Sequence, residues 1–133
     1  MFAMKMFILV SMLILGLTGC ASQPETSGSL IDREELKVDP EVIYTMDVKE
    51  LFEKRLEQPG GERLLQVQFA VEARSDTELA WKVTWFDESG MVVRGVGEGY
   101  KKATLLTGQT RYFSSTAPNA RVTSYQLHLR EPK

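Results

Sequence analysis

Apolar and polar residues alternate along two stretches in the middle of the chain, which is the pattern of a β-strand buried on one face. In residues 65–74 every second position is apolar: Leu65, Val67, Phe69, Val71 and Ala73. In residues 79–86 the same spacing is held by Leu79, Trp81, Val83 and Trp85. The polar run Ser75-Asp76-Thr77 between them is a turn signal. We therefore expect two strands that pair antiparallel through this short turn.

Shorter runs farther along the chain predict more strands. Met91-Val92-Val93 begins a strand after the turn Asp87-Glu88-Ser89-Gly90. Leu105-Leu106 leads through Thr107-Gly108-Gln109 into a strand over residues 110–116, with Tyr112 or Phe113 inward. After the turn cluster 117–120, a last strand over residues 122–130 places one set of side chains on a shared face: Tyr125, Leu127 and Leu129. Short strands at regular spacing favour a mainly β fold, and we expect a small immunoglobulin-like antiparallel β-sandwich over residues 38–133.

Two segments ahead of the alternating stretches have mixed patterns. Residues 38–44 fit an edge strand, because Pro40 lacks the N–H that a central strand must donate. Residues 47–56 have two interpretations. Asp47 and Glu50 have the spacing of a capping box, and the apolar residues that follow fall near one helical face: Val48, Leu51, Phe52 and Leu56. The same residues could form an irregular strand, and we favour the short helix.

The N-terminus carries targeting information rather than fold information. Lys5 precedes a run over residues 6–17 that is apolar apart from Ser11 and Gly16. As a helix this run would span about 18 Å, well short of the roughly 30 Å hydrocarbon core of a membrane. Residues 1–19 are therefore expected to be a signal peptide.

A lipoprotein motif follows the apolar run. Leu17-Thr18-Gly19-Cys20 resembles the bacterial lipoprotein box. The resemblance implies cleavage before Cys20, a diacylglycerol on its thiol and a fatty acid such as palmitate on its new amine. Residues 20–37 are mostly small and polar without a periodic apolar face, so we expect this segment to be a flexible tether. No Asp follows the Cys directly, which favours the periplasmic face of the outer membrane over the inner membrane.

Composition narrows the function classes. The chain has 133 residues, 43% of them hydrophobic and 26% charged, which suits one globular domain. A formal net charge of −2 argues against a nucleic-acid-binding protein. With one Cys, assigned to the lipid, and one His, the chain offers no intramolecular disulfide, no thiol catalysis and no zinc-ligand set. We expect no cofactor and no metal.

The order of motifs over residues 48–130 resembles the YcfL family of small lipoproteins of Gram-negative bacteria. The resemblance rests on Leu64-Leu65-Gln66-Val67-Gln68, Trp85-Phe86-Asp87 with Gly90, Leu105 with Gly108-Gln109, and Ala117-Pro118-Asn119-Ala120. Ala73 stands where family members often have Asn. The family implies a β-sandwich and brings no catalytic residues. Its genes are often found beside that of a lipoprotein activator of a peptidoglycan synthase, which implies a cell-wall role.

Residues with catalytic or ligand-binding potential are few. His128 alternates with Leu127 and Leu129, so we expect it on the solvent face in a structural role rather than as a catalytic base. The glycines of residues 95–99 lack the following helix that a phosphate-binding loop needs, and we expect a mobile or bulged loop. Asp87 and Glu88 suit a turn. Trp81 and Trp85 share a face and are expected in the core.

Aromatic side chains outside the core favour a binding role. Phe86 and Phe113 are expected on the outer faces, and with Gly97 and His128 they form the candidate interaction surface. We favour a non-enzymatic module that binds another envelope protein. The alternative is a module for glycan or peptidoglycan fragments that uses exposed aromatics and the 95–99 loop. A hydrolase built on His128 or the acidic turn is the least supported.

Overall fold

The computed structural model describes residues 32–133, so the predicted signal peptide, Cys20 and most of the tether lie outside the described residues. The elements follow one another as β1 (Leu36–Val38), α2 (Pro40–Thr45), β2 (Met46–Glu57), β3 (Arg63–Ala73), β4 (Thr77–Asp87), β5 (Val92–Val93), β6 (Lys101–Leu105), β7 (Thr110–Thr116) and β8 (Val122–Arg130). Strand β1 begins two residues before the expected domain boundary at residue 38.

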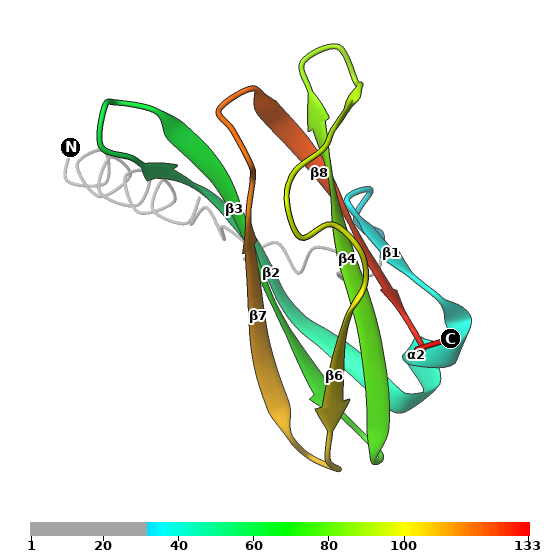
Figure 1. Cartoon of the computed structure of the whole chain (residues 1–133). Coiled ribbons are helices and arrows are strands. Elements are labelled where there is room, and N and C mark those ends of the chain that lie inside the picture. Colours follow the sequence, from blue (N-terminus) through cyan, green and yellow to red (C-terminus); the bar gives the residue numbers. More distant parts are fainter. Residues whose placement is uncertain (1–31) are drawn as a thin grey trace, which may run out of the picture.

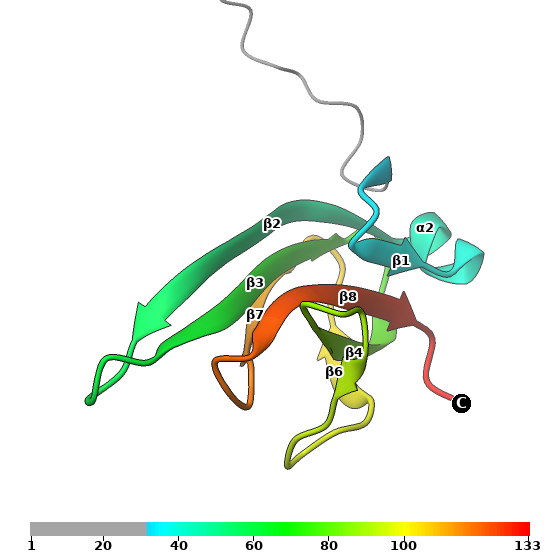
Figure 2. The same cartoon turned by 90° about the horizontal axis from the view of Figure 1, so that it is seen from above.

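Two sheets pack face to face, as Figures 1 and 2 show from the side and from above. The first sheet has the order β1-β8-β4, with β5 and β6 both paired to the remaining edge of β4. The second has the order β2-β3-β7. Strand β1 runs parallel to β8, and the other described pairings are antiparallel. The predicted small, mainly β sandwich is confirmed.

The strands β3 and β4 form where alternation predicts them, but they do not pair with each other. β3 pairs with β2 and β7 in one sheet, whereas β4 pairs with β8, β5 and β6 in the other. The turn after Ala73 therefore carries the chain across the sandwich. Asp76 fixes this crossing, because its Oδ1 accepts hydrogen bonds from the Thr107 N–H at 2.8 Å and the Thr107 hydroxyl at 2.9 Å. The predicted antiparallel pair is wrong, because two strands that each bury one face can also meet face to face.

The aromatic core shows this face-to-face contact directly. The Phe69 ring of β3 lies 5.1 Å from the Trp81 ring of β4, edge to face, and 5.2 Å from the Phe113 ring of β7. Phe69 is fully buried, and Trp81 and Phe113 are themselves 5.6 Å apart. Aromatic pairs at these separations add to the stabilisation from burial. This cluster joins the two sheets at their centre.

The helix predicted over residues 47–56 is wrong, because these residues belong to strand β2. Val48 pairs with Val71 and Glu50 with Ala70, so Lys49 is the extra residue of a β-bulge. The bulge turns both Val48 and Leu51 toward the core although they are three residues apart in sequence. A spacing of three is also that of a helical face, which is why the pattern suggested a helix.

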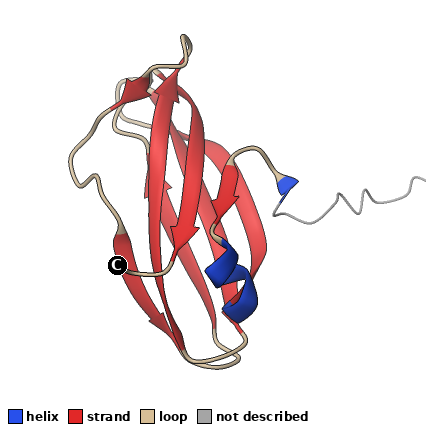
Figure 3. Cartoon of the chain, turned by 90° about the vertical axis from the view of Figure 1, so that its right-hand side faces the viewer, coloured by secondary structure: helices blue, strands red, loops and turns tan. Residues whose placement is uncertain are grey.

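Helix α2 lies just upstream, and the edge strand expected over residues 38–44 is wrong beyond Val38. Pro40 begins α2, where a missing N–H costs nothing because the first turn has no acceptor for it. Figure 3 shows α2, in blue, lying against the side of the sandwich. The helix contacts β2 and β8, and its Val42 side chain is fully buried.

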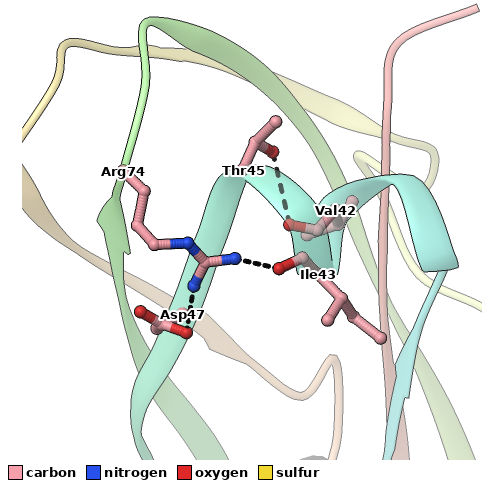
Figure 4. Close-up of polar contacts among 5 residues, drawn as sticks. All are labelled: Val42, Ile43, Thr45, Asp47 and Arg74. Carbon is pink, nitrogen blue, oxygen red and sulfur yellow. Dashed lines mark hydrogen bonds and ion pairs between the residues drawn. The ribbon is translucent and has the colours of Figure 1, made fainter.

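The junction between α2 and β2 is held by polar contacts drawn in Figure 4. The Thr45 hydroxyl donates to the Val42 carbonyl at 3.3 Å. Arg74, just after β3, donates to the Ile43 carbonyl and to the Asp47 carboxylate. A carbonyl at the end of a helix has no partner within the helix, so Arg74 supplies one and ties the junction to the second sheet.

Candidate functional site

One side of the sandwich is closed by contacts between the two sheets. There Arg55 of β2 donates through Nη1 to the Val122 carbonyl of β8 at 2.9 Å. Arg33, just before β1, donates to the Leu51 carbonyl at 2.8 Å. Helix α2 lies on the lower part of this side in Figure 3, where it contacts both β2 and β8. The candidate site therefore lies on the opposite side of the sandwich, where β5 and β6 flank β4.

The opposite side has a gap in the strand pairing. Trp85 of β4 pairs with Val93 of β5, and Trp81 pairs with Lys101 of β6. Between these two pairs β4 has three residues, 82–84, while the chain beside it has seven, 94–100. The seven-residue segment loops out, so residues 82–84 lack a strand partner on this side among the described strands. Their backbone groups on this edge are free to pair with another chain.

A cleft of about 450 Å³ opens beside this gap, and we refer to it as the edge cleft. Residues 81–83 of β4 form one wall and residues 114–116 of β7 form the other. β7 is itself the last strand of its sheet, paired with β3 alone among the described strands. The loop 95–99, Trp85, Lys101 and Pro118 complete the lining. Figure 1 shows this loop, in yellow-green, curving out between β5 and β6 on the side of β4 that faces β7.

The glycines of the loop have specific structural roles. A Cβ on Gly95 would lie 2.7 Å from the Pro118 Cβ, so a glycine is needed for the loop to pack on the turn after β7. Gly97 has a φ of +79°, which side-chain-bearing residues rarely adopt. The Glu98 carboxylate accepts the Gly95 N–H at 2.7 Å and closes the loop on itself. The sequence expectation of a bulged loop over residues 95–99 is confirmed.

The edge cleft is polar along its β7 wall. Its β7 wall consists of Ser114, Ser115 and Thr116, and a cation and an anion come from Lys101 and Glu98. The tryptophans at its base are only 5–6% exposed. The Lys101 ammonium also sits 4.8 Å from the centre of the Trp81 ring, over its face. A buried and covered indole offers little area for a sugar ring, whereas free strand edges and hydroxyl groups suit a polypeptide backbone.

The four residues of the predicted interaction surface do not come together. Gly97 lines the edge cleft. Phe113 faces inward against Phe69, so its predicted placement on the outer face is wrong. Its neighbour Tyr112 is the residue that faces outward. Phe86 lies on the outer face of the first sheet, half-buried and paired across the strands with Val92. His128 lies on the outer face of the same sheet, away from the cleft.

His128 has two hydrogen-bond partners that the sequence did not reveal. Its Nε2 lies 2.8 Å from the Asp39 carboxylate and its Nδ1 lies 2.6 Å from the Tyr100 hydroxyl. With Nε2–H donating to the carboxylate, the neutral ring accepts the tyrosine hydroxyl at Nδ1. The partners are 89 and 28 residues away in sequence, so no local spacing connects them. The contact joins the β1–α2 junction and the end of the glycine loop to β8.

The hydrogen bond from His128 and the nearby positive charges lower the pKa of Asp39 below its ordinary value of 3.8. We expect an NMR titration of the carboxyl carbon to place Asp39 below that value, and His128→Gln to raise it. A depressed folded pKa means that the contact stabilises the fold above pH 3.8 and that this stabilisation is lost as pH falls through the lowered pKa. Asp76, whose pKa is lowered by Thr107 instead, is the matched control and should not move in His128→Gln.

The acidic turn after β4 is built as the sequence predicts. Asp87 Oδ1 accepts the Ser89 N–H and hydroxyl at 2.9 and 2.7 Å and the Met91 N–H at 3.0 Å. These hydrogen bonds, chiefly that of the Ser89 hydroxyl, lower the pKa of Asp87. The carboxylate is thus engaged in shaping the turn. Within residues 32–133, no three His, Cys, Asp or Glu side chains lie close enough to hold a metal ion.

The part of the chain from β2 to β8 matches a known protein family. Residues 46–131 match the model of a family described as protein of unknown function, DUF1425. A crystal structure of a DUF1425 family member from Shewanella is 26% identical, with a TM-score of 0.54 over 66% of this chain and 79% of that one. A Campylobacter jejuni protein, Cj0090, is 18% identical, with a TM-score of 0.57 over 75% of this chain and all of that one, which is a likeness of fold. No curated protein matches the chain. Among the described helices, none is long and apolar enough to cross a membrane.

Proposed function

The chain belongs to the DUF1425 family of proteins of unknown function, and we propose that it binds an extended segment of another envelope protein at the edge cleft. In this proposal it is a non-enzymatic lipoprotein, held by acyl chains at Cys20 on the periplasmic face of the outer membrane. Within the family we place it with the YcfL lipoproteins, on the lipobox and the corner Trp85-Phe86-Asp87 with Gly90. A role in cell-wall or envelope assembly fits both the location and that kinship.

The observation that carries the proposal is the unpaired edge of β4 at residues 82–84, which forms part of the edge cleft. An extended peptide that enters there gains backbone hydrogen bonds from a strand edge, as in other cases of strand addition. The free edge of β7 offers a second row of backbone groups across the cleft. The polar side chains of the β7 wall can then contact the side chains of the bound segment.

Site-specific photo-crosslinking in cells tests this proposal. A photoreactive phenylalanine is placed at Val96, which is fully exposed on the loop, and at Ser115, which lines the cleft. The control position is Tyr112, which is 60% exposed on the outer face of the same strand as Ser115. We expect the same polypeptide adduct from Val96 and Ser115 and none from Tyr112. Equal adducts at all three positions would contradict binding in the cleft.

A matched pair of substitutions separates a cleft from a general surface. Ser115→Arg puts a long side chain into the edge cleft, and Ser124→Arg puts the same side chain on the exposed outer face of β8. We expect Ser115→Arg to lower capture of the crosslinked partner at least about tenfold, the loss expected for a central contact, while Ser124→Arg leaves capture unchanged. If Ser115→Arg instead abolished pull-down by purified sacculi, with no polypeptide captured, a glycan ligand would replace the protein.

A further inference from the structure

Basic side chains gather on the outer face of the first sheet, beside the edge cleft, which one of them, Lys82, also lines. The strand register places Lys37 of β1, His128 of β8 and Lys82 of β4 in one row across the sheet. In the next row Arg130 of β8 and Lys102 of β6 lie on either side of Ala80. Because alternate residues of a strand share a face, all five side chains stand on the outer face. We call these five residues the basic face.

The basic face is organised around Tyr100, which comes from the end of the glycine loop. The Arg130 guanidinium lies 3.4 Å from the centre of the Tyr100 ring, and the Lys82 ammonium lies 5.7 Å from it. The Tyr100 hydroxyl is bound to His128, and the two rings meet edge to face. Cations over an aromatic face are attracted to it and held in place. These contacts keep Arg130 and Lys82 close together despite their like charge.

Few acidic side chains neutralise this face. Glu78 of β4 stands at one end of it, and the Asp39 carboxylate, bound by the neutral ring of His128, is a second anionic group near Lys37. No ion pair joins the four Lys and Arg side chains of the basic face to an acidic residue within 32–133. The Arg130 Nε is buried without a hydrogen-bond acceptor among these residues. In a chain with a formal net charge of −2, this face is a local excess of positive charge that attracts anions.

The connection to the N-terminal tether indicates which anions these are. The described chain begins at Asp32 and enters the fold through β1, whose Lys37 is the first member of the basic face. The 12 residues from Cys20 to Ile31 would, as flexible coil, span roughly 17–21 Å. A lipid anchored at Cys20 would thus hold the basic face near the bilayer, within reach of its headgroups. We propose that the basic face docks on anionic phospholipid, with lipid phosphates as counter-charges to its Lys and Arg side chains.

This inference rests on the proposed anchor at Cys20 and not on the edge cleft. Docking on the bilayer would fix the orientation of the sandwich, with the outer face of the first sheet toward the membrane. The edge cleft opens between the two sheets and not on that face. The cleft would then stay open to the periplasm while the protein rests on its membrane. The two surfaces would thus serve different contacts of the same molecule.

Amine footprinting of the lipidated full-length product tests the docking. The protein is reconstituted into vesicles of phosphatidylcholine alone or mixed with phosphatidylglycerol, and each lysine's labelling rate is read by mass spectrometry. We expect Lys37, Lys82 and Lys102 to react roughly fivefold more slowly on the anionic vesicles. Lys49 and Lys54 of the second sheet are internal controls and should react equally on both. Raising the salt concentration should remove the protection, since the attraction is between charges at an exposed surface.

Two variants make the footprint specific. Lys82→Gln/Arg130→Gln removes the charges around Tyr100, and we expect the reporters Lys37 and Lys102 to lose their protection. Lys102→Gln changes one exposed side chain that has no polar partner, so the fold should be unaffected. We expect Lys37 to be less protected on anionic vesicles in this variant. Lys49→Gln/Arg63→Gln removes the same charge from the second sheet and should leave protection of the basic face intact.

Three outcomes would overturn the proposal. Equal labelling of the basic face on both vesicles would show that it does not meet the membrane. The same protection from inorganic phosphate added to phosphatidylcholine vesicles would assign the face to free anions instead of a lipid surface. The intact mass of the reconstituted protein shows separately whether acyl chains are attached. Protein without acyl chains would contradict the proposed attachment at Cys20, and with it the argument that the tether holds the basic face near the bilayer. Loss of partner crosslinks in the cleft would leave the footprint unchanged.

Discussion

Phe69→Ala is expected to lower the free energy of unfolding by about 3–5 kcal/mol, the range for removing a buried aromatic side chain. Phe69 is fully buried and contacts Trp81 and Phe113, one from each sheet. Truncation therefore leaves a cavity between the sheets and removes two ring pairs at once. Domains of this size have a total stability of roughly 5–15 kcal/mol, so the variant should be close to unfolding. Urea denaturation followed by tryptophan fluorescence measures the loss.

Phe52→Ala is the matched control for this prediction. Phe52 belongs to β2 of the same sheet, but its side chain is 59% exposed on the outer face. The same chemical deletion there should cost less than about 1 kcal/mol, because little apolar area returns to water and no cavity forms. Phe69→Leu, which keeps most of the volume, should fall between the two variants. Equal losses in Phe52→Ala and Phe69→Ala would contradict the inward placement of Phe69.

Cys20→Ala is expected to abolish acylation of the protein. Without the thiol no diacylglycerol can attach, and in lipoproteins this attachment precedes cleavage of the signal peptide. Cells fed a labelled fatty acid should therefore label the wild-type protein and not the variant, whose intact mass should still include residues 1–19. Each buried methylene of an acyl chain contributes about 0.8 kcal/mol, so we expect two or more chains to hold the wild-type protein in the membrane through a high-salt wash.

Thr18→Ser is the control for the lipobox, because it keeps a small hydroxyl residue at that position and should label normally. Density-gradient separation of the two membranes then tests the sorting expectation, and we expect the labelled wild-type protein in the outer-membrane fraction. If Cys20→Ala were still labelled by the fatty acid, the lipid would not be attached at Cys20. Wild-type protein in the inner-membrane fraction would leave the anchor intact and correct the location.

The candidate site could be predicted from the sequence only in part. The glycines of residues 95–99 signalled a bulged loop, and Gly97 does line the edge cleft. The cleft itself depends on the pairing of β4, whose partner strand resumes four residues later in sequence than a continuous ladder would require. Neither the pairing of β4 with β5 nor its pairing with β6 can be recognised from a local sequence pattern. The contact of His128 with Asp39 and Tyr100 is likewise formed by residues that only the fold brings together.

The sequence by itself determined the local properties of this chain. Alternation located β3, β4 and β8, because the period of two is a property of each strand whatever its partner. Turn chemistry placed the corner at Asp87, whose side-chain hydrogen bonds reach no farther than Met91. Tertiary structure alone decided which strands pair, because alternation says that a face is buried and not what buries it. For the same reason the three-residue spacing of Val48 and Leu51 was resolved only by the ladder with β3, where the bulge at Lys49 places both on the core face.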